Sequence, residues 1–138
     1  MASVMYLAVQ YVSLPERVPT HFNAFNVPDG WGPKWMMLIP LVIGFAIWIG
    51  LHVLEKFPHI HNYLWLTEEN ARRQYKNSQL LLNSMKNIIL VFFSFMTIET
   101  VRISFGKPSL LGVWEMPIFL FVLFGTMGCF LFRSYRLR

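Results

Sequence analysis

The sequence predicts an all-α fold, an integral membrane bundle of four helices with an ordered, proline-rich extracytoplasmic loop after the first helix. The 138 residues are 55% hydrophobic and only 14% charged, with a mean hydropathy of +0.45, which exceeds the apolar content usual in soluble domains. The apolar residues gather in long runs, which is typical of membrane spans. Four of the eight prolines lie in residues 14–34, between the first two runs. A single membrane domain, residues 1–138, accounts for this pattern.

The four apolar runs define the expected spans. The first run, residues 1–14, is short, because it reaches only about 20 Å against a hydrocarbon core of about 30 Å. We expect it to extend into the loop, to thin the bilayer or to continue upstream of Met1, and an interfacial segment is the alternative. The remaining spans are expected at about residues 35–54, 80–103 and 113–132, with a cytoplasmic segment at 55–79.

A long helix is predicted around the third span. Thr67 with the acids that follow it indicates a helix start, and neither glycine nor proline interrupts the chain before Ser104. Amide side chains repeat along this helix at Gln79, Asn83 and Asn87, with the i, i+4, i+8 spacing of one face. Because amides are costly against lipid, we expect this stripe to face the bundle, either in hydrogen bonds between helices or around a solvated cavity.

Basic residues are distributed unequally between the two sides of the predicted spans. One side holds eight, namely Lys56, Arg72, Arg73, Lys76, Lys86, Arg133, Arg136 and Arg138. The other side holds four, namely Arg17, Lys34, Arg102 and Lys107. This asymmetry predicts both termini in the cytoplasm and residues 14–34 outside. Since the charges flank the spans, the net charge of +5 indicates topology and not a nucleic-acid partner.

Residues 14–35 read LPERVPTHFNAFNVPDGWGPKW, and the prolines predict a stiff, extended path with a turn at Pro28–Gly30. A second block downstream contains FP, NY, TEEN and RRQY, within residues 57–75. In both blocks the chain resembles the SdpI-like bacterial membrane protein family, whose domain of unknown function 1648 forms the N-terminal half of SdpI-type immunity proteins. Asn26 stands where that family usually has glycine, and asparagine tolerates left-handed backbone, so we expect the turn to persist.

The first functional hypothesis is a ligand-binding surface at the outer mouth of the bundle. Its candidate residues come from the loop and from the outer ends of the last two spans: His21, Asn23, Asp29, Trp31, Lys34, Glu99, Arg102 and Glu115. Glu99 is the strongest candidate, because an acid at membrane depth is costly, and we expect it to pair with Arg102 at i, i+3. The resemblance also implies a cytoplasmic regulator, for which the candidate residues are Arg72, Arg73 and Lys76.

The expected function, implied by the resemblance, is a non-enzymatic binding, immunity or sensing module for an extracytoplasmic peptide or envelope signal. The alternative is a membrane-embedded enzyme or transporter subunit, with His21 as base and Asp29 or Glu99 as its orienting partner. A purely structural role for the loop polar groups stays open. We expect the lipid bilayer as a partner and association between copies of the chain. We expect no cofactor and no metal, because the chain has no glycine-rich phosphate loop and His59 and His61 would diverge along an extended segment.

Overall fold

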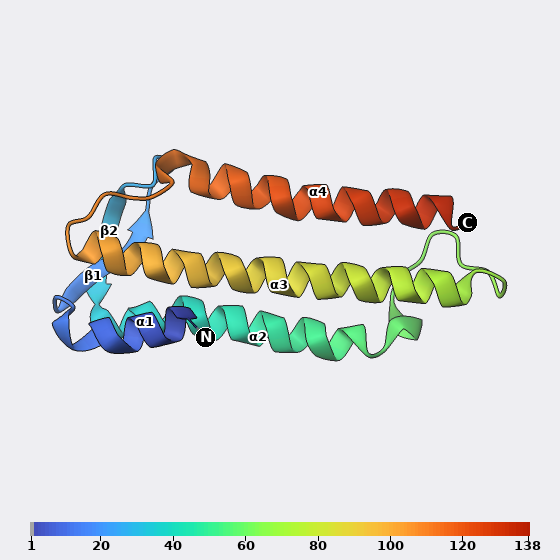
Figure 1. Ribbon diagram of the computed structural model, residues 1–138, viewed down its shortest axis with the longest axis horizontal. Helices are drawn as coiled ribbons and strands as arrows, with labels where there is room; N and C mark the ends of the chain where they lie inside the picture. Colours follow the sequence, from blue (N-terminus) through green and yellow to red (C-terminus); the bar gives the residue numbers. More distant parts are fainter. Residues whose placement is uncertain (1) are drawn as a thin grey trace.

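The computed structural model describes residues 2–138, and within them the chain forms four α-helices and one two-stranded sheet. The elements in chain order are α1 (Ala2–Gln10), β1 (Arg17–Phe22), β2 (Pro28–Pro33), α2 (Leu38–Glu55), α3 (Ala71–Ser104) and α4 (Glu115–Arg136). Helices α2, α3 and α4 run side by side, with α3 in the middle (Figure 1). The β-hairpin and α1 both lie at one end of these helices, which we call the hairpin end; the opposite end is the far end.

Three helices of the described chain are long and apolar enough to cross a membrane, and they cover Lys34–Glu55, Ala71–Ser104 and Gly112–Arg136. The second, third and fourth predicted spans are therefore confirmed as long apolar helices. The third helix begins at Ala71, after a turn in which Thr67 and Asn70 exchange hydrogen bonds between side chain and backbone N–H (2.8 and 3.3 Å). The helix therefore begins three residues after the predicted start at Glu68, and its N-cap residue is Asn70, not Thr67 as predicted.

The first predicted span, residues 1–14, requires a correction. Helix α1 has 9 residues, or about 14 Å, and a short 3-10 turn at Tyr11–Ser13 follows it. Leu14 then adopts an extended backbone (φ −64°, ψ 142°), because the residue before Pro15 is driven away from helical angles. Of the expected alternatives, extension of the helix into the loop is therefore wrong. Helix α1 is not among the three described helices that are long and apolar enough to cross a membrane, and Met1 lies outside the described residues.

Within residues 14–34, where we expected an ordered loop with an extended path, strands β1 and β2 form an antiparallel hairpin. Val18 pairs with Gly32 and His21 pairs with Gly30, with an irregular register after Pro19, which has no N–H to donate. The pairing is close, since a Cβ at Gly30 would lie 2.8 Å from the Cβ of His21. Glycine is thus required at Gly30 for strand approach, and the prediction of a turn at Pro28–Gly30 is wrong.

The turn of the hairpin lies at residues 23–27. The Asn23 side chain accepts hydrogen bonds from the backbone N–H groups of Phe25 (2.9 Å) and Val27 (3.1 Å). Asn26 has φ 57°, in the left-handed region that asparagine tolerates better than most residues. The prediction that asparagine can replace glycine at Asn26 is therefore confirmed.

An apolar core fixes the hairpin to the helices. Its buried members come from α1, the segment after it, β1, α2 with its preceding turn, and α3: Leu7, Leu14, Val18, Met37, Leu41 and Val101. Val18 and Val101 are fully buried, so β1 is packed directly against α3. Farther along, Gly44 of α2 lies against Phe93 of α3, where an added Cβ would come within 2.9 Å of the Phe93 Cβ. This close approach of α2 to α3 thus depends on a glycine.

Replacing Gly44 by alanine is expected to separate α2 from α3 and to destabilise the fold by about 1–3 kcal/mol, the usual cost of overpacking. The matched control is Gly50→Ala on the same helix, where nothing lies within 4 Å of an added Cβ. We expect no loss of stability there, because alanine favours helix over glycine. Thermal unfolding of both variants in mild detergent, followed by circular dichroism, measures the difference. Equal losses in the two variants would contradict the close contact.

Candidate functional site

Of the predicted outer residues, three lie on the hairpin close to its turn. The imidazole Nδ1 of His21 contacts the Asp29 carboxylate across the two strands, and both side chains are exposed. Asn23 is occupied by its hydrogen bonds to the turn backbone. His21 and Asn23 also line a pocket between the hairpin and the start of α4. The structure therefore brings His21 and Asp29 together, as one reading of the sequence required.

Two other predicted residues lie at the base of the hairpin. Lys34 donates a hydrogen bond to Glu16 (2.9 Å) and stands over the ring of Tyr11, with its nitrogen 5.6 Å from the ring centroid. Trp31 is 49% exposed, and its carbonyl accepts a hydrogen bond from Arg17 (3.0 Å). Neither Lys34 nor Trp31 is among the residues that line the pocket. These contacts hold the hairpin base in shape.

The remaining predicted residues gather where α3 ends and α4 begins. One carboxylate oxygen of Glu99, Oε1, accepts hydrogen bonds from the Ser109 hydroxyl and from the backbone N–H of Leu110. The other oxygen, Oε2, lies 3.9 Å from Nε of Arg102, as expected for an i, i+3 pair. Both of these atoms are buried, and neither has a hydrogen-bond partner within residues 2–138. The Glu99 side chain is only 3% exposed, so half of a buried carboxylate remains unsatisfied.

Asn26 connects the hairpin turn to this region, and sequence reasoning missed its role in the site. Its side-chain amide donates to Glu115 Oε2 (2.8 Å) and also lies 3.3 Å from the hydroxyl of Ser109, which in turn donates to Glu99. Glu115 is 8% exposed. The sequence indicated that Asn26 adopts a left-handed backbone, but it did not indicate the partners of its side chain. These partners, Ser109 and Glu115, lie 83 and 89 residues farther along the chain.

A pocket of about 530 Å³ opens between the hairpin turn and the start of α4. Its lining combines polar groups with apolar ones: Thr20, His21, Phe22, Asn23, Ala24, Asn26, Met96, Gly112, Val113, Glu115 and Met116. A second cavity of only about 10 Å³ shares four of these residues (Phe22, Asn26, Met96 and Glu115) and adds Glu99 and Thr100. The small cavity therefore adjoins the larger pocket and carries both carboxylates in its lining.

The charges around the small cavity do not balance. We call Glu99, Arg102 and Glu115 the hairpin-end acidic cluster; when both carboxyl groups are ionised, two negative charges face one guanidinium, for a formal net charge of −1. Burying an uncompensated charge costs several kcal/mol, so such a cluster favours any positively charged group that reaches it. This electrostatic property is the main chemical feature of the hairpin end.

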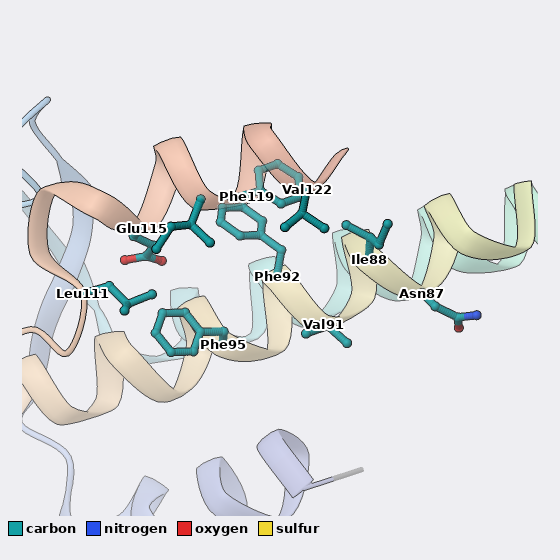
Figure 2. A pocket seen from close by; sticks show the side chains of 10 residues that line it. Asn87, Ile88, Val91, Phe92, Phe95, Leu111, Glu115, Phe119 and Val122 are labelled. Carbon is teal, nitrogen blue, oxygen red and sulfur yellow. The ribbon is translucent and has the colours of Figure 1, made fainter. Parts of the chain in front are cut away.

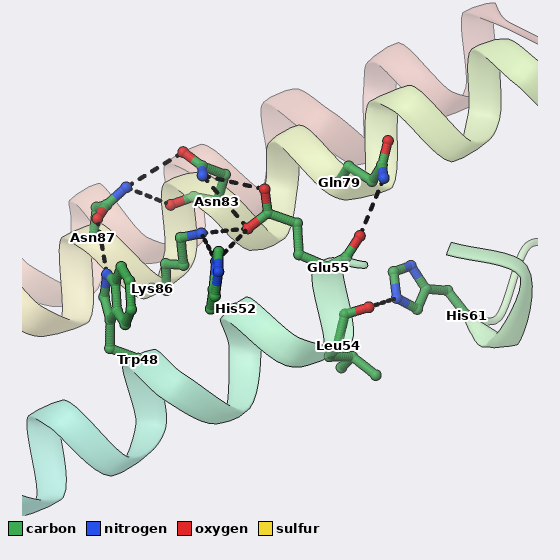
Figure 3. A network of polar contacts seen from close by, with 9 residues as sticks. All are labelled: Trp48, His52, Leu54, Glu55, His61, Gln79, Asn83, Lys86 and Asn87. Carbon is green, nitrogen blue, oxygen red and sulfur yellow. Dashed lines mark hydrogen bonds and ion pairs between the residues drawn. The ribbon is translucent and has the colours of Figure 1, made fainter. Parts of the chain in front are cut away.

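A second polar cluster lies between α2 and α3, toward the far end (Figure 3). The ammonium group of Lys86 donates to the Glu55 carboxylate and to Nδ1 of His52 (3.1 Å), and it lies 5.2 Å from the ring centroid of Trp48. The Lys86 side chain is 4% exposed. We call Lys86, Glu55, His52 and Trp48 the Lys86 network.

The predicted amide stripe of α3 completes this network. Asn83 donates to both carboxylate oxygens of Glu55 (3.3 and 3.4 Å), Gln79 donates to the Glu55 carbonyl (3.1 Å), and Asn87 accepts from the indole of Trp48 (3.2 Å). The stripe therefore makes hydrogen bonds between helices, which was one of the two predicted alternatives. The pairing of Lys86 with Glu55 was not predicted. In the sequence, each looks like a charge at the end of a membrane span, and 31 residues separate them.

A groove of about 390 Å³ separates α3 from α4, lined mainly by apolar side chains such as Phe92, Phe119 and Val122 (Figure 2). Phe92 and Phe119 stack across it with ring centroids 3.8 Å apart. Its two polar lining residues, Asn87 and Glu115, are already engaged in the hydrogen bonds described above. The groove thus offers apolar contact area and no group suited to catalysis.

At the far end, the predicted regulator-binding residues Arg72, Arg73 and Lys76 are exposed on the first turns of α3. The two loop histidines differ in exposure, and His59 is the exposed one. His61 is half-buried, since Nε2 donates to the carbonyl of Leu54 (2.9 Å) and Nδ1 lies 2.9 Å from the Ser78 hydroxyl. His61 therefore fastens the loop between α2 and α3.

Replacing Lys86 by methionine is expected to destabilise the fold by about 2 kcal/mol, because it leaves the Glu55 carboxylate without its charged partner. The double variant Lys86→Met, Glu55→Gln removes both charges and should recover much of that loss. Chemical unfolding in detergent micelles measures the three stabilities. Additive losses in the double variant would contradict a direct energetic coupling between the two residues.

In a comparison with protein families, a family model described as "Domain of unknown function (DUF1648)" matches residues 1–45. The match covers α1, the hairpin and the first part of α2, which includes the first of the two sequence blocks. It confirms the resemblance to that domain, and it does not extend to the second block. No curated protein and no solved structure matches the chain.

Proposed function

We propose that this chain is a multi-pass bacterial membrane protein that binds an extracytoplasmic peptide or envelope signal at its hairpin end, without catalysing a reaction. The observation that carries the proposal is the pocket of about 530 Å³ between the hairpin turn and the start of α4. Its lining joins apolar side chains such as Phe22 and Met116 to polar groups such as Asn23 and Glu115. Such a mixed lining on a stiff scaffold is typical of ligand sites.

The proposed orientation places the hairpin end outside. Basic residues are enriched at the far end, where the exposed residues Arg72, Arg73 and Lys76 and the arginines after Phe132 lie, and this side is expected in the cytoplasm. We propose that α1, which has 9 residues and is not among the three candidate spans, remains in the extracytoplasmic half and that the end of α4 is cytoplasmic. This topology replaces the expectation of two cytoplasmic termini.

The exposed basic turn of α3 supports a second, cytoplasmic contact. Arg72 and Lys76 are one helical turn apart, and Arg73 is adjacent, so the three side chains form a compact positive surface. Resemblance to SdpI-type proteins favours a cytoplasmic regulator as the partner of this surface, and it is the basis for an immunity or signalling role. Charge complementarity would require an acidic face on that partner.

A membrane-embedded enzyme is the second candidate function, and the contact between His21 and Asp29 favours it. A carboxylate that orients an imidazole is a recurring arrangement in general base catalysis. The third member of the predicted catalytic cluster is placed differently: Glu99 is buried and bonded to Ser109 and Leu110. Binding therefore explains more of the site than catalysis does.

Site-specific photocrosslinking in intact cells tests the proposed function. A photoreactive residue at Ala24, which is exposed and lines the pocket, is expected to form an adduct with an extracytoplasmic peptide. The matched control position is Leu64, which is 78% exposed in the far-end loop and should give no such adduct. The adduct mass identifies the peptide.

A pocket-filling variant links this adduct to the pocket. Met116→Trp should reduce the adduct at position 24 by filling the pocket, whereas Met116→Leu keeps a similar side-chain volume and should retain it. No peptide adduct at position 24, or an equal adduct at position 64, would contradict the proposal.

A further inference from the structure

We infer that the hairpin-end pocket recognises an ammonium group of its ligand, held between the carboxylates of Glu115 and Glu99. This inference rests on the proposed function and adds the chemical group that the site recognises. The ligand class is a primary amine on an apolar stem, as found in a lysine side chain or at the N-terminus of an apolar peptide.

The first argument is charge. The Lys86 network contains one ammonium group and one carboxylate, so its charges cancel within the protein. The hairpin-end acidic cluster holds two carboxylates and only one guanidinium, and all three groups are largely buried. One further positive charge balances the cluster and removes the cost of an uncompensated buried charge.

The second argument is hydrogen bonding. Glu99 Oε1 already has two donors, whereas the buried Oε2 has none within the described residues. An N–H donor from a ligand would satisfy this oxygen, and a charged donor forms the stronger bond. Arg102 cannot do so in the observed geometry, because its Nε lies 3.9 Å away.

The third argument is shape. The small cavity of about 10 Å³ is close to the space that one water molecule needs, which is also the scale of an ammonium head group. The adjoining pocket of about 530 Å³ contributes Phe22, Met96 and Met116, against which a methylene stem can pack. An apolar stem with a single charged tip therefore fits both cavities together.

A bound metal ion explains the cluster less well. Hard cations need several oxygen ligands, and residues 2–138 contain no group of three or more metal-ligating acids, histidines or cysteines. In addition, the Asn26 amide presents its N–H₂ side to Glu115, and donor groups that point at a carboxylate compete with a metal ion for it. The geometry points to a donor-bearing cation.

Methionine-methyl NMR of the full chain in nanodiscs tests the inference with n-hexylammonium as the probe. Met96 lines both cavities and Met116 lines the larger one, and Met→Leu variants assign their signals. We expect a saturable shift of both signals with n-hexylammonium and none with n-hexanol, which has the same stem without the charge. Glu115→Gln and Glu99→Gln should each weaken binding by about tenfold or more, as expected for the loss of a charged hydrogen-bond partner.

The matched control is Glu16→Gln, which removes the same charge from an exposed acid at the hairpin end that lines neither cavity. It should bind n-hexylammonium as the unmodified chain does, and the ligand-free methionine spectrum reports whether each variant is folded. Equal shifts with n-hexanol, undiminished binding in both cluster variants, or the same shifts with sodium ions alone would overturn the inference. Loss of ammonium binding with the peptide adduct at position 24 retained would overturn this inference alone. Ammonium binding without any adduct would overturn the proposed function alone.

Discussion

The side chain of Asn26 is the contact on which the hairpin end depends. It occupies the tight, left-handed position of the hairpin turn, and its amide reaches the helix ends by bonding to Glu115 and approaching Ser109. Because Ser109 also donates to Glu99, one asparagine links the turn to both buried carboxylates. The pocket exists because the turn is held at this distance from α4.

The two polar clusters have different roles: the Lys86 network stabilises the fold, and the hairpin-end acidic cluster lies beside the proposed binding pocket. In the Lys86 network the charges cancel, the partners come from facing helices, and the amide stripe supplies further hydrogen bonds, so the network binds α2 to α3. In the hairpin-end acidic cluster one negative charge and one carboxylate oxygen remain unmatched beside an open pocket. Buried polar groups without partners lower the stability of the fold. They are retained most readily where a ligand supplies the missing hydrogen bond or charge.

Features that depend on local sequence were predictable. Uninterrupted apolar runs gave the three long helices, the spacing of Gln79, Asn83 and Asn87 gave the bonded face of α3, and asparagine chemistry gave the left-handed backbone at Asn26. The family match over residues 1–45 agrees with the first sequence block. These features follow from neighbours within one or two helical turns.

Features that depend on distant residues were not predictable. The strand pairing of the hairpin could not be predicted, because prolines usually weaken strands. In this hairpin the prolines lie at positions where the strand pairing does not need a backbone N–H donor. The pairing of Lys86 with Glu55 and of Asn26 with Glu115 requires knowing which helix faces lie together. Helix α1 and the 3-10 turn after it end before Leu14, because Pro15 holds Leu14 in an extended backbone; the prediction gave more weight to the apolar character of residues 1–14 than to this proline.

Hydrogen exchange of the hairpin in Asn26→Gly tests the central claim most directly. Glycine keeps the left-handed backbone while deleting the amide that bonds to Glu115, so the turn chemistry is preserved and only the tether is lost. We predict faster exchange confined to the amides of residues 23–28, with the amides of Arg17 and Val18 still protected because Val18 is buried in the core. Unchanged exchange at residues 23–28 would contradict the claim that Asn26 fastens the hairpin to the helix ends.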